Sequence, residues 1–129
     1  MNEKYTMQYS RIYSDNEGES HFEDISIDLT PVDFAPPAPP LNIASPFETE
    51  RMILCTIPAD WFGNWHPTPR RQFYIQLSGE LEVEVSDGEI RRFSAGSLVL
   101  LEDTTGKGHL TREMGSKGVN AVFVQLPPI

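Results

Sequence analysis

Short segments in which apolar and polar residues alternate run through most of the chain, and no long segment repeats apolar residues at helical spacing. Clusters rich in glycine, proline and aspartate separate these segments. Alternating segments between turn clusters are typical of an all-β sandwich or barrel, which is the fold class we predict. The expected strands cover residues 7–13, 22–29, 51–57, 71–77, 81–86, 89–93, 97–102, 109–113 and 120–126.

The clearest local pattern is a hairpin over residues 80–93. Its first half alternates leucine or valine with glutamate, which indicates a strand that is buried on one face. Asp87-Gly88 follows, and this pair favours a two-residue turn because such a turn needs positive φ. A turn of this length places Glu84 opposite Arg91, a favourable cross-strand pair. The same register places Val83 opposite Arg92, which is a poor pair, and a bulge near the turn would shift the register.

Residues 31–47 form a different kind of segment, with six prolines in the sequence PVDFAPPAPPLNIASPF. Proline lacks the N–H group that a sheet ladder needs, so we expect an extended strap across the barrel exterior and no central strand. A lid over the barrel mouth and an arm that reaches a second subunit are the alternatives. Phe34, Leu41, Ile43 and Phe47 are the apolar side chains that would dock the segment.

Composition narrows the function classes. The length of 129 residues predicts one domain, and a net charge of −9 argues against nucleic acid and anionic membranes as partners. The single cysteine, Cys55, allows no internal disulfide, so a reducing cytoplasm is the expected location. No apolar stretch approaches the length of a membrane span, and the first residues lack the pattern of a signal peptide.

The strand expected over residues 71–77 can face the interior in two ways. Polar side chains at even positions share one face if the phase is kept back to residue 66: His66, Thr68, Gln72, Tyr74 and Gln76. The other face carries Phe73, Ile75 and Leu77. If the apolar face points inward, no polar site exists here. If the polar face points inward, the apolar face needs cover from the proline-rich segment or a second chain, and periodicity alone leaves both arrangements open.

Two motifs resemble those of the cupins, a family of small β-barrels that usually hold a metal. In residues 66–72, HPTPRRQ, His66 matches the first histidine of the first cupin motif, while Thr68 and Gln72 stand where a second histidine and a glutamate are usual. Gly79 matches the glycine that ends this motif. In the second motif, Gly96 is followed by the apolar segment LVLL and then by His109.

The resemblance covers residues 51–126 and is closest to a group of small single-domain cupins. It implies a jelly-roll barrel, a double-stranded β-helix, as one domain over residues 1–129, with residues 1–50 forming N-terminal strands and the proline-rich strap. It also implies that Gln72, Tyr74 and Gln76 face inward, and that the chain is a homodimer.

A metal centre of the cupin type would here use His66, Gln72 and His109. None of these ligands carries a formal charge, and an amide oxygen is a weak ligand for zinc, iron or nickel. Glu102 or Asp103 could lend a carboxylate from the strand end. Loss of the anionic ligand weakens any divalent site, so we expect either no cofactor or one divalent metal. Without a metal, His66 and His109 can still act as acid and base, because imidazole titrates near neutral pH.

These residues favour a small-molecule-binding protein. The leading hypothesis is an enzyme in which His66 and His109 perform isomerase, lyase or cyclase chemistry by acid–base catalysis. A non-catalytic binder or sensor with the same pocket is the alternative, and a metal-dependent oxygenase is a further one. Candidate substrate-binding residues are Trp65, Thr68, Arg70, Tyr74 and Gln76. His21 is expected at the surface, and Cys55 in the core as an inert residue.

Overall fold

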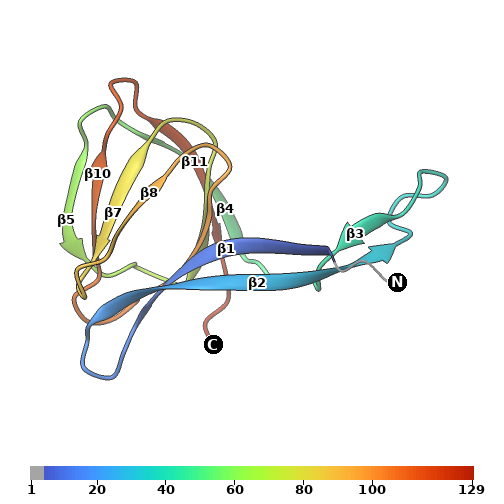
Figure 1. Cartoon of the computed structure of the whole chain (residues 1–129), viewed down its shortest axis with the longest axis horizontal. Helices are drawn as coiled ribbons and strands as arrows, with labels where there is room; N and C mark the ends of the chain where they lie inside the picture. The colour runs from blue at the N-terminus through green and yellow to red at the C-terminus, as the bar shows by residue number, and fades with distance from the viewer. Residues whose placement is uncertain (1–4) are drawn as a thin grey trace.

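The structure, a computed structural model, describes residues 5–129, and this part of the chain consists of β-strands joined by turns and loops (Figure 1). The all-β prediction is therefore confirmed. The strands are β1 (Tyr5–Ser14), β2 (Ser20–Val32), β3 (Leu41–Ile43), β4 (Arg51–Ile57), β5 (Phe62–His66), β6 (Gln72–Gln76), β7 (Leu81–Val85), β8 (Ile90–Phe93), β9 (Leu98–Glu102), β10 (His109–Glu113) and β11 (Val119–Gln125). Within residues 5–129 no helix is long and apolar enough to cross a membrane.

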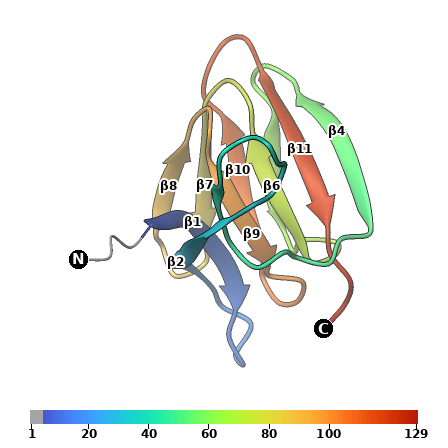
Figure 2. The ribbon, with the colours of Figure 1, turned by 90° about the vertical axis from the view of Figure 1, so that its right-hand side faces the viewer.

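Two sheets face each other, as jelly rolls do. The larger has seven strands in the order β3-β2-β1-β9-β6-β11-β4, and the smaller has four in the order β5-β10-β7-β8. Neighbouring strands are antiparallel except β1 and β9, which run parallel. Figure 2 shows β4, β11 and β6 on one side of the barrel and β8, β7 and β10 on the other.

Two strands were not predicted. β5 contains Gly63 and Asn64, which are poor strand formers, so its sequence lacks a strand pattern. It forms because β10 offers a ladder, in which Thr111 lies opposite Gly63. β3 lies within the proline-rich segment at the edge of the larger sheet, where the rule that keeps proline out of central strands does not apply.

The predicted register of the hairpin is wrong. Glu84 lies opposite Ile90, and Arg91 lies opposite Val83. The backbone N–H of Val85 bonds to the carbonyl of Glu89 at 3.1 Å, so the loop that this pair closes has three residues, 86–88, instead of two. Gly88 takes the positive φ, +100°, that a three-residue hairpin loop needs at its last position.

Buried apolar side chains form two clusters on the two faces of the larger sheet. The main cluster fills the space between the sheets and includes Ile12, Val85 and Val99. The second lies on the outer face, where Phe73 packs with Leu100 and Leu126. The ring of Phe47, from the proline-rich segment, covers Phe73 with 4.9 Å between ring centroids. Phe73 therefore points outward, and the polar side chains on either side of it point inward.

The first strands extend well beyond the barrel (Figure 1). We call this projection the arm, residues 5–8 and 26–43. Tyr5 lies opposite Leu29 and Met7 opposite Ile27, so one face of its two-stranded ribbon is apolar. Met7 is 50% exposed, which means that this face has no covering layer within the described chain.

Candidate functional site

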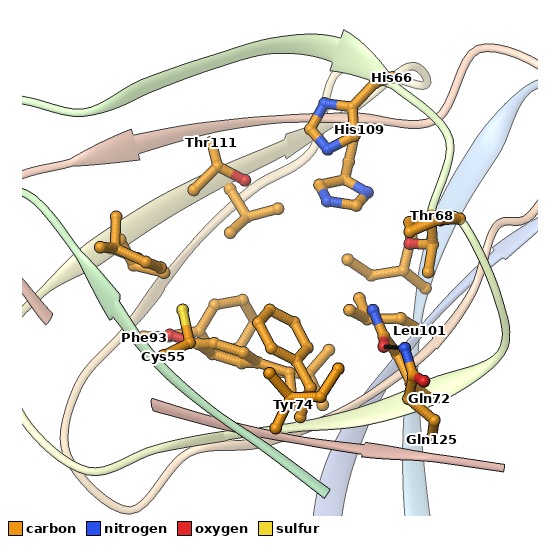
Figure 3. Close-up of a pocket in the computed structure, with 18 of the residues that line it drawn as sticks. Cys55, His66, Thr68, Gln72, Tyr74, Phe93, Leu101, His109, Thr111 and Gln125 are labelled. Carbon is orange, nitrogen blue, oxygen red and sulfur yellow. Dashed lines mark hydrogen bonds between the residues drawn. The ribbon is translucent and has the colours of Figure 1, made fainter. Parts of the chain in front are cut away.

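A cavity of about 400 Å³ lies between the two sheets (Figure 3). Apolar side chains make up most of its wall: Ile12, Ile53, Cys55, Ile57, Trp61, Pro69, Leu81, Val83, Phe93, Val99, Leu101 and Phe123. The polar lining residues are fewer: His66, Thr68, Gln72, Tyr74, His109, Thr111 and Gln125. In Figure 3, His66, His109, Thr68 and Gln72 lie toward one side of the cavity, and Cys55 and Phe93 lie toward the other. Such a cavity suits a small ligand with an apolar body and a polar end.

Asp103 holds His109 at the polar side. The Asp103 side chain is fully buried at the end of β9, and its Oδ2 lies 2.6 Å from Nδ1 of His109. The Thr68 hydroxyl donates a hydrogen bond of 2.8 Å to the other carboxylate oxygen. Since a carboxylate accepts, Nδ1 of His109 carries the hydrogen and Nε2 is left for a ligand. The three residues form a chain Thr68–Asp103–His109 that fixes the orientation of the imidazole.

His66 stands beside His109. The two ring centroids are 5.0 Å apart, and the residues lie opposite each other in the pairing of β5 with β10. Nδ1 of His66 is 2.6 Å from the carbonyl oxygen of Asn64, which can only accept. Nδ1 therefore donates, and Nε2 is again the free ring nitrogen. Both histidines line the cavity, and within residues 5–129 neither Nε2 has a hydrogen-bond partner.

A glycine allows this close approach. Gly108 directly precedes His109 and has φ +71°, a backbone conformation that side chains disfavour. A Cβ added at this position would lie 1.9 Å from the carbonyl oxygen of His66. The glycine-rich loop before β10 thus brings the backbone of the second motif onto that of the first.

Two amides and an arginine form a second polar chain. Nε of Arg51 donates to Oε1 of Gln125 at 2.8 Å, and Nε2 of Gln125 donates to Oε1 of Gln72 at 3.1 Å. Gln72 and Gln125 face each other in the ladder between β6 and β11, and both are buried. The oxygen of Gln72, which would be its metal-binding atom, is therefore occupied within the protein.

Tyr74 and Gln76 bond to each other and to the backbone. The Tyr74 hydroxyl donates to Oε1 of Gln76 at 2.9 Å, and the amide of Gln76 donates to the carbonyl oxygens of Gly79 and Phe93 at 2.9 Å each. Burial raises the pKa of Tyr74 well above its usual value. Tyr74 lines the cavity with its ring, whereas Gln76 is not among the lining residues.

Trp65 and Arg70 also lie outside the lining. Trp65 is partly exposed, and Arg70 forms an ion pair with Glu50 and donates to the carbonyl of Leu126 at 2.9 Å. Trp61 takes the place on the wall that was expected of Trp65. Its indole lies over Gly63, where a Cβ would come within 2.3 Å of the ring, so the glycine makes room for it.

The two acids at the end of β9 differ in their surroundings. Glu102 accepts hydrogen bonds of 2.6 Å from both Arg11 and Arg71 on the outer side of the sheet. Burial alone would raise the pKa of Glu102, but the two guanidinium groups hold it below the usual value. Asp103 is the acid that turns toward the histidines.

Cys55 also belongs to the cavity wall. The side chain is half-buried, and burial raises the pKa of its thiol. The prediction that placed Cys55 in the core is therefore wrong, because the side chain lines the cavity, and its inertness stays a prediction.

The donors at the polar side do not fit a cupin metal centre. No group of three or more histidine, cysteine, aspartate or glutamate side chains within residues 5–129 could hold a metal ion. Both oxygens of Asp103 and the oxygen of Gln72 are already hydrogen-bonded. Two neutral imidazoles are the ligands that remain, and a divalent ion in a low-dielectric cavity needs more compensation than they supply.

Sequence reasoning proposed five residues that the cavity brings together, namely His66, Thr68, Gln72, Tyr74 and His109. It missed Trp61, Thr111 and Gln125, and it considered Asp103 only as a metal ligand. For Gln125 the available signal was the strand expected at residues 120–126. The sequence does not give the register that places this strand with Gln125 opposite Gln72.

Comparisons with known proteins concern the fold. No protein-family model matches the sequence, and no curated protein matches it. Among solved structures, the cupin domain of Cnp3 from Schizosaccharomyces pombe is similar, with 10% identity, a TM-score of 0.48, and coverage of 97% of this chain and 86% of that one. Protein NMB1881 from Neisseria meningitidis has 17% identity and a TM-score of 0.44, with coverage of 59% and 72%. A structure described as a putative ethanolamine utilization protein EutQ, from Salmonella typhimurium, has 14% identity and a TM-score of 0.33, with coverage of 95% and 98%.

The structure brings the two sequence motifs together. His66 of the first motif and His109 of the second meet at one side of a cavity between two facing sheets. The chain has an all-β fold of two facing sheets, and a cupin domain is among the structures to which it is similar.

Proposed function

We propose that this protein binds a small, mainly apolar molecule inside a cupin barrel and acts on it by acid–base catalysis. The observation that carries the proposal is the chain from Thr68 through the buried Asp103 to His109, which ends beside His66 in the cavity. An imidazole whose tautomer is fixed by a buried carboxylate is the usual arrangement of a general base.

The chemistry follows from the two free ring nitrogens. Nε2 of His109 would take a proton from the ligand, and the resulting imidazolium would be stabilised by Asp103. Nε2 of His66 would deliver a proton at a second atom of the same ligand, which requires that His66 enters the step as the imidazolium. A proton removed at one atom and added at another gives an isomerisation. Departure of a leaving group from the neighbouring atom after proton removal gives a lyase reaction, and attack of the deprotonated atom on an electrophilic carbon of the same ligand gives a cyclase reaction.

A non-catalytic binder or sensor is the second candidate. It is supported by the small number of polar groups in the cavity, because an apolar wall gives affinity without chemistry. We do not propose oxygenase chemistry, since the donor set does not fit a metal.

Proton exchange in D₂O separates the two candidates. The probe is 1-indanone, a small neutral ketone with acidic C–H bonds next to its carbonyl. The enzyme hypothesis predicts that the protein accelerates deuterium incorporation at these positions, and that His109→Asn lowers the rate by about 100-fold or more while the fold, followed by circular dichroism, is retained. Binding without exchange would support the sensor, and absence of binding would reject both candidates.

We also propose that two copies associate through the arm. The apolar face that carries Met7, Ile27 and Leu29 has no covering layer within the described chain, and an exposed apolar ribbon is a common site of association. The proline-rich segment contributes Phe34 and Leu41 to this projection, both exposed. None of residues 31–47 lines the cavity, which favours the arm or strap over the lid.

A further inference from the structure

The hydrogen bonds from Arg51 to Gln125 and from Gln125 to Gln72 allow only one orientation of each side-chain amide. A guanidinium has no acceptor, so Arg51 must meet the oxygen of Gln125. The nitrogen of Gln125 then faces Gln72, and this nitrogen can bond only to an acceptor. The oxygen of Gln72 is thereby turned away from the ligand space, and its NH₂ group is turned toward it.

The NH₂ group of Gln72 is available to a ligand. No hydrogen bond to it is formed within residues 5–129, although Gln72 lines the cavity. The nitrogen of this group is also not fully buried. Among the fully buried side-chain nitrogen and oxygen atoms of residues 5–129, Glu113 Oε2 alone lacks a hydrogen-bond partner, so the unpartnered nitrogen of Gln72 must be partly accessible. Figure 3 shows the hydrogen bond between the two amides at the edge of the cavity.

We propose that Gln72 is a binding residue that donates to an oxygen of the ligand, and that Gln125 is its positioning residue. The proposal rests on the proposed function and names its ligand class: an apolar molecule that carries a carbonyl-type oxygen. Apolar side chains make up most of the cavity wall, so a ligand oxygen that reached none of its few donors would lose its hydration without compensation. The donor thus selects for acceptor-bearing ligands.

Two neutral bicyclic probes of similar size test this assignment. 1-Indanone has an acceptor and no donor, whereas indole has an N–H donor and no strong acceptor. Binding of each is measured by ligand-observed NMR and by the shift of the His66 and His109 ring signals. Gln72 gives 1-indanone a hydrogen bond that indole cannot make, so this bond raises the affinity of 1-indanone relative to indole by about three- to tenfold, while the N–H of indole can bond only to the Nε2 atoms of the histidines.

Gln125→Glu reverses the orientation of Gln72. A carboxylate at this position only accepts, so it takes hydrogen bonds from Arg51 and from the NH₂ group of Gln72, and the oxygen of Gln72 turns to the cavity. Indole then binds more tightly than 1-indanone. Gln8→Glu adds the same charge at an exposed position and leaves the preference unchanged.

A second variant keeps the test decisive if Gln125→Glu does not fold. Gln72→Leu removes the donor and leaves the cavity apolar, so it weakens 1-indanone several-fold and leaves indole unchanged or tighter. A reversed preference in the first variant, or a selective loss in the second, supports the assignment. An unchanged preference in both variants overturns the assignment of Gln72. If the probes still bind in that case and shift the histidine signals, the proposed function stands. Failure of both probes to bind the wild-type protein overturns the proposed function as well.

Discussion

β1 passes through two regions of the molecule and carries its apolar residues on one face in the barrel and on the opposite face in the arm. In the barrel, Ile12 is 1% exposed, because its face of the larger sheet meets the smaller sheet. In the arm, five residues earlier, Met7 is 50% exposed, because no second layer lies against the ribbon. Burial in the barrel encloses a cavity with a few oriented polar groups, whereas the open face of the arm is suited to another surface. Alternation alone therefore says which residues share a face, and the opposing layer decides what that face does.

The largest difference between the two regions should be seen in stability. Leu81 is 3% exposed and packs in the main cluster, so Leu81→Ala should lower the free energy of unfolding by about 2–5 kcal/mol. Met7→Ala in the arm should change the stability of the monomer by less than about 1 kcal/mol. Urea unfolding at low protein concentration measures both. Similar losses would mean that the arm is part of the cooperative core.

Two glycines extend the comparison to an enclosed and an open turn. Both Gly108 and Gly88 have positive φ, so alanine at either should cost about 1–2 kcal/mol in backbone strain. Gly108→Ala should cost more, because the added Cβ meets the His66 carbonyl, whereas nothing lies within 4 Å of a Cβ at Gly88. The difference in unfolding free energy between the two variants isolates the contact between the motifs. Equal losses would contradict the close approach on which the histidine pair depends.

The fold was largely predictable, because most strands carry a local pattern. His66 and His109 were found from the spacing of two motifs, which is also local. The bond between Asp103 and His109 was not foreseen, since it depends on how a glycine-rich loop folds back over six residues. The pairing of Gln72 with Gln125 depends on the register between β6 and β11, which are far apart in the sequence. A register shift of one residue would have abolished it. The hairpin shows how easily such a shift arises: one extra loop residue changed every pair.

The open face of the arm can be tested by adding a charge. If two copies associate there, Met7→Asp should weaken the dimer by about tenfold or more, because the carboxylate would be buried without a partner. Thr6→Asp, on the opposite face of the same strand, is the matched control and should leave the dimer intact. Sedimentation velocity over a range of concentrations measures both. A wild-type monomer at all concentrations, or equal effects of the two variants, would remove the proposed association.

The smallest expected effect lies at the turn where β1 and β2 meet the barrel. His21 is hydrogen-bonded through both ring nitrogens, at 2.7 Å to Asp15 and 2.8 Å to Asp87. Both bonds raise the pKa of His21, and the bond to Asp15 has the larger effect. The bonds should therefore stabilise the fold fully below the ordinary histidine pKa of about 6.5, and this contribution should disappear as the pH rises through the raised value. The pKa of Asp87 is lowered by the backbone N–H of Glu89 and then by His21, and that of Asp15 mainly by His21, so the contribution is also lost in acid.

His21→Gln should accordingly be less stable than the wild type at about pH 6 and nearly equal to it at about pH 9. Urea unfolding at the two pH values gives the difference, and Asp28→Asn, which removes an exposed acid on the same strand, serves as the control. A deficit that is the same at both pH values would mean that His21 contributes by packing against Tyr13, whose ring lies 5.4 Å away, and that its charge has no part in joining the turn to the barrel.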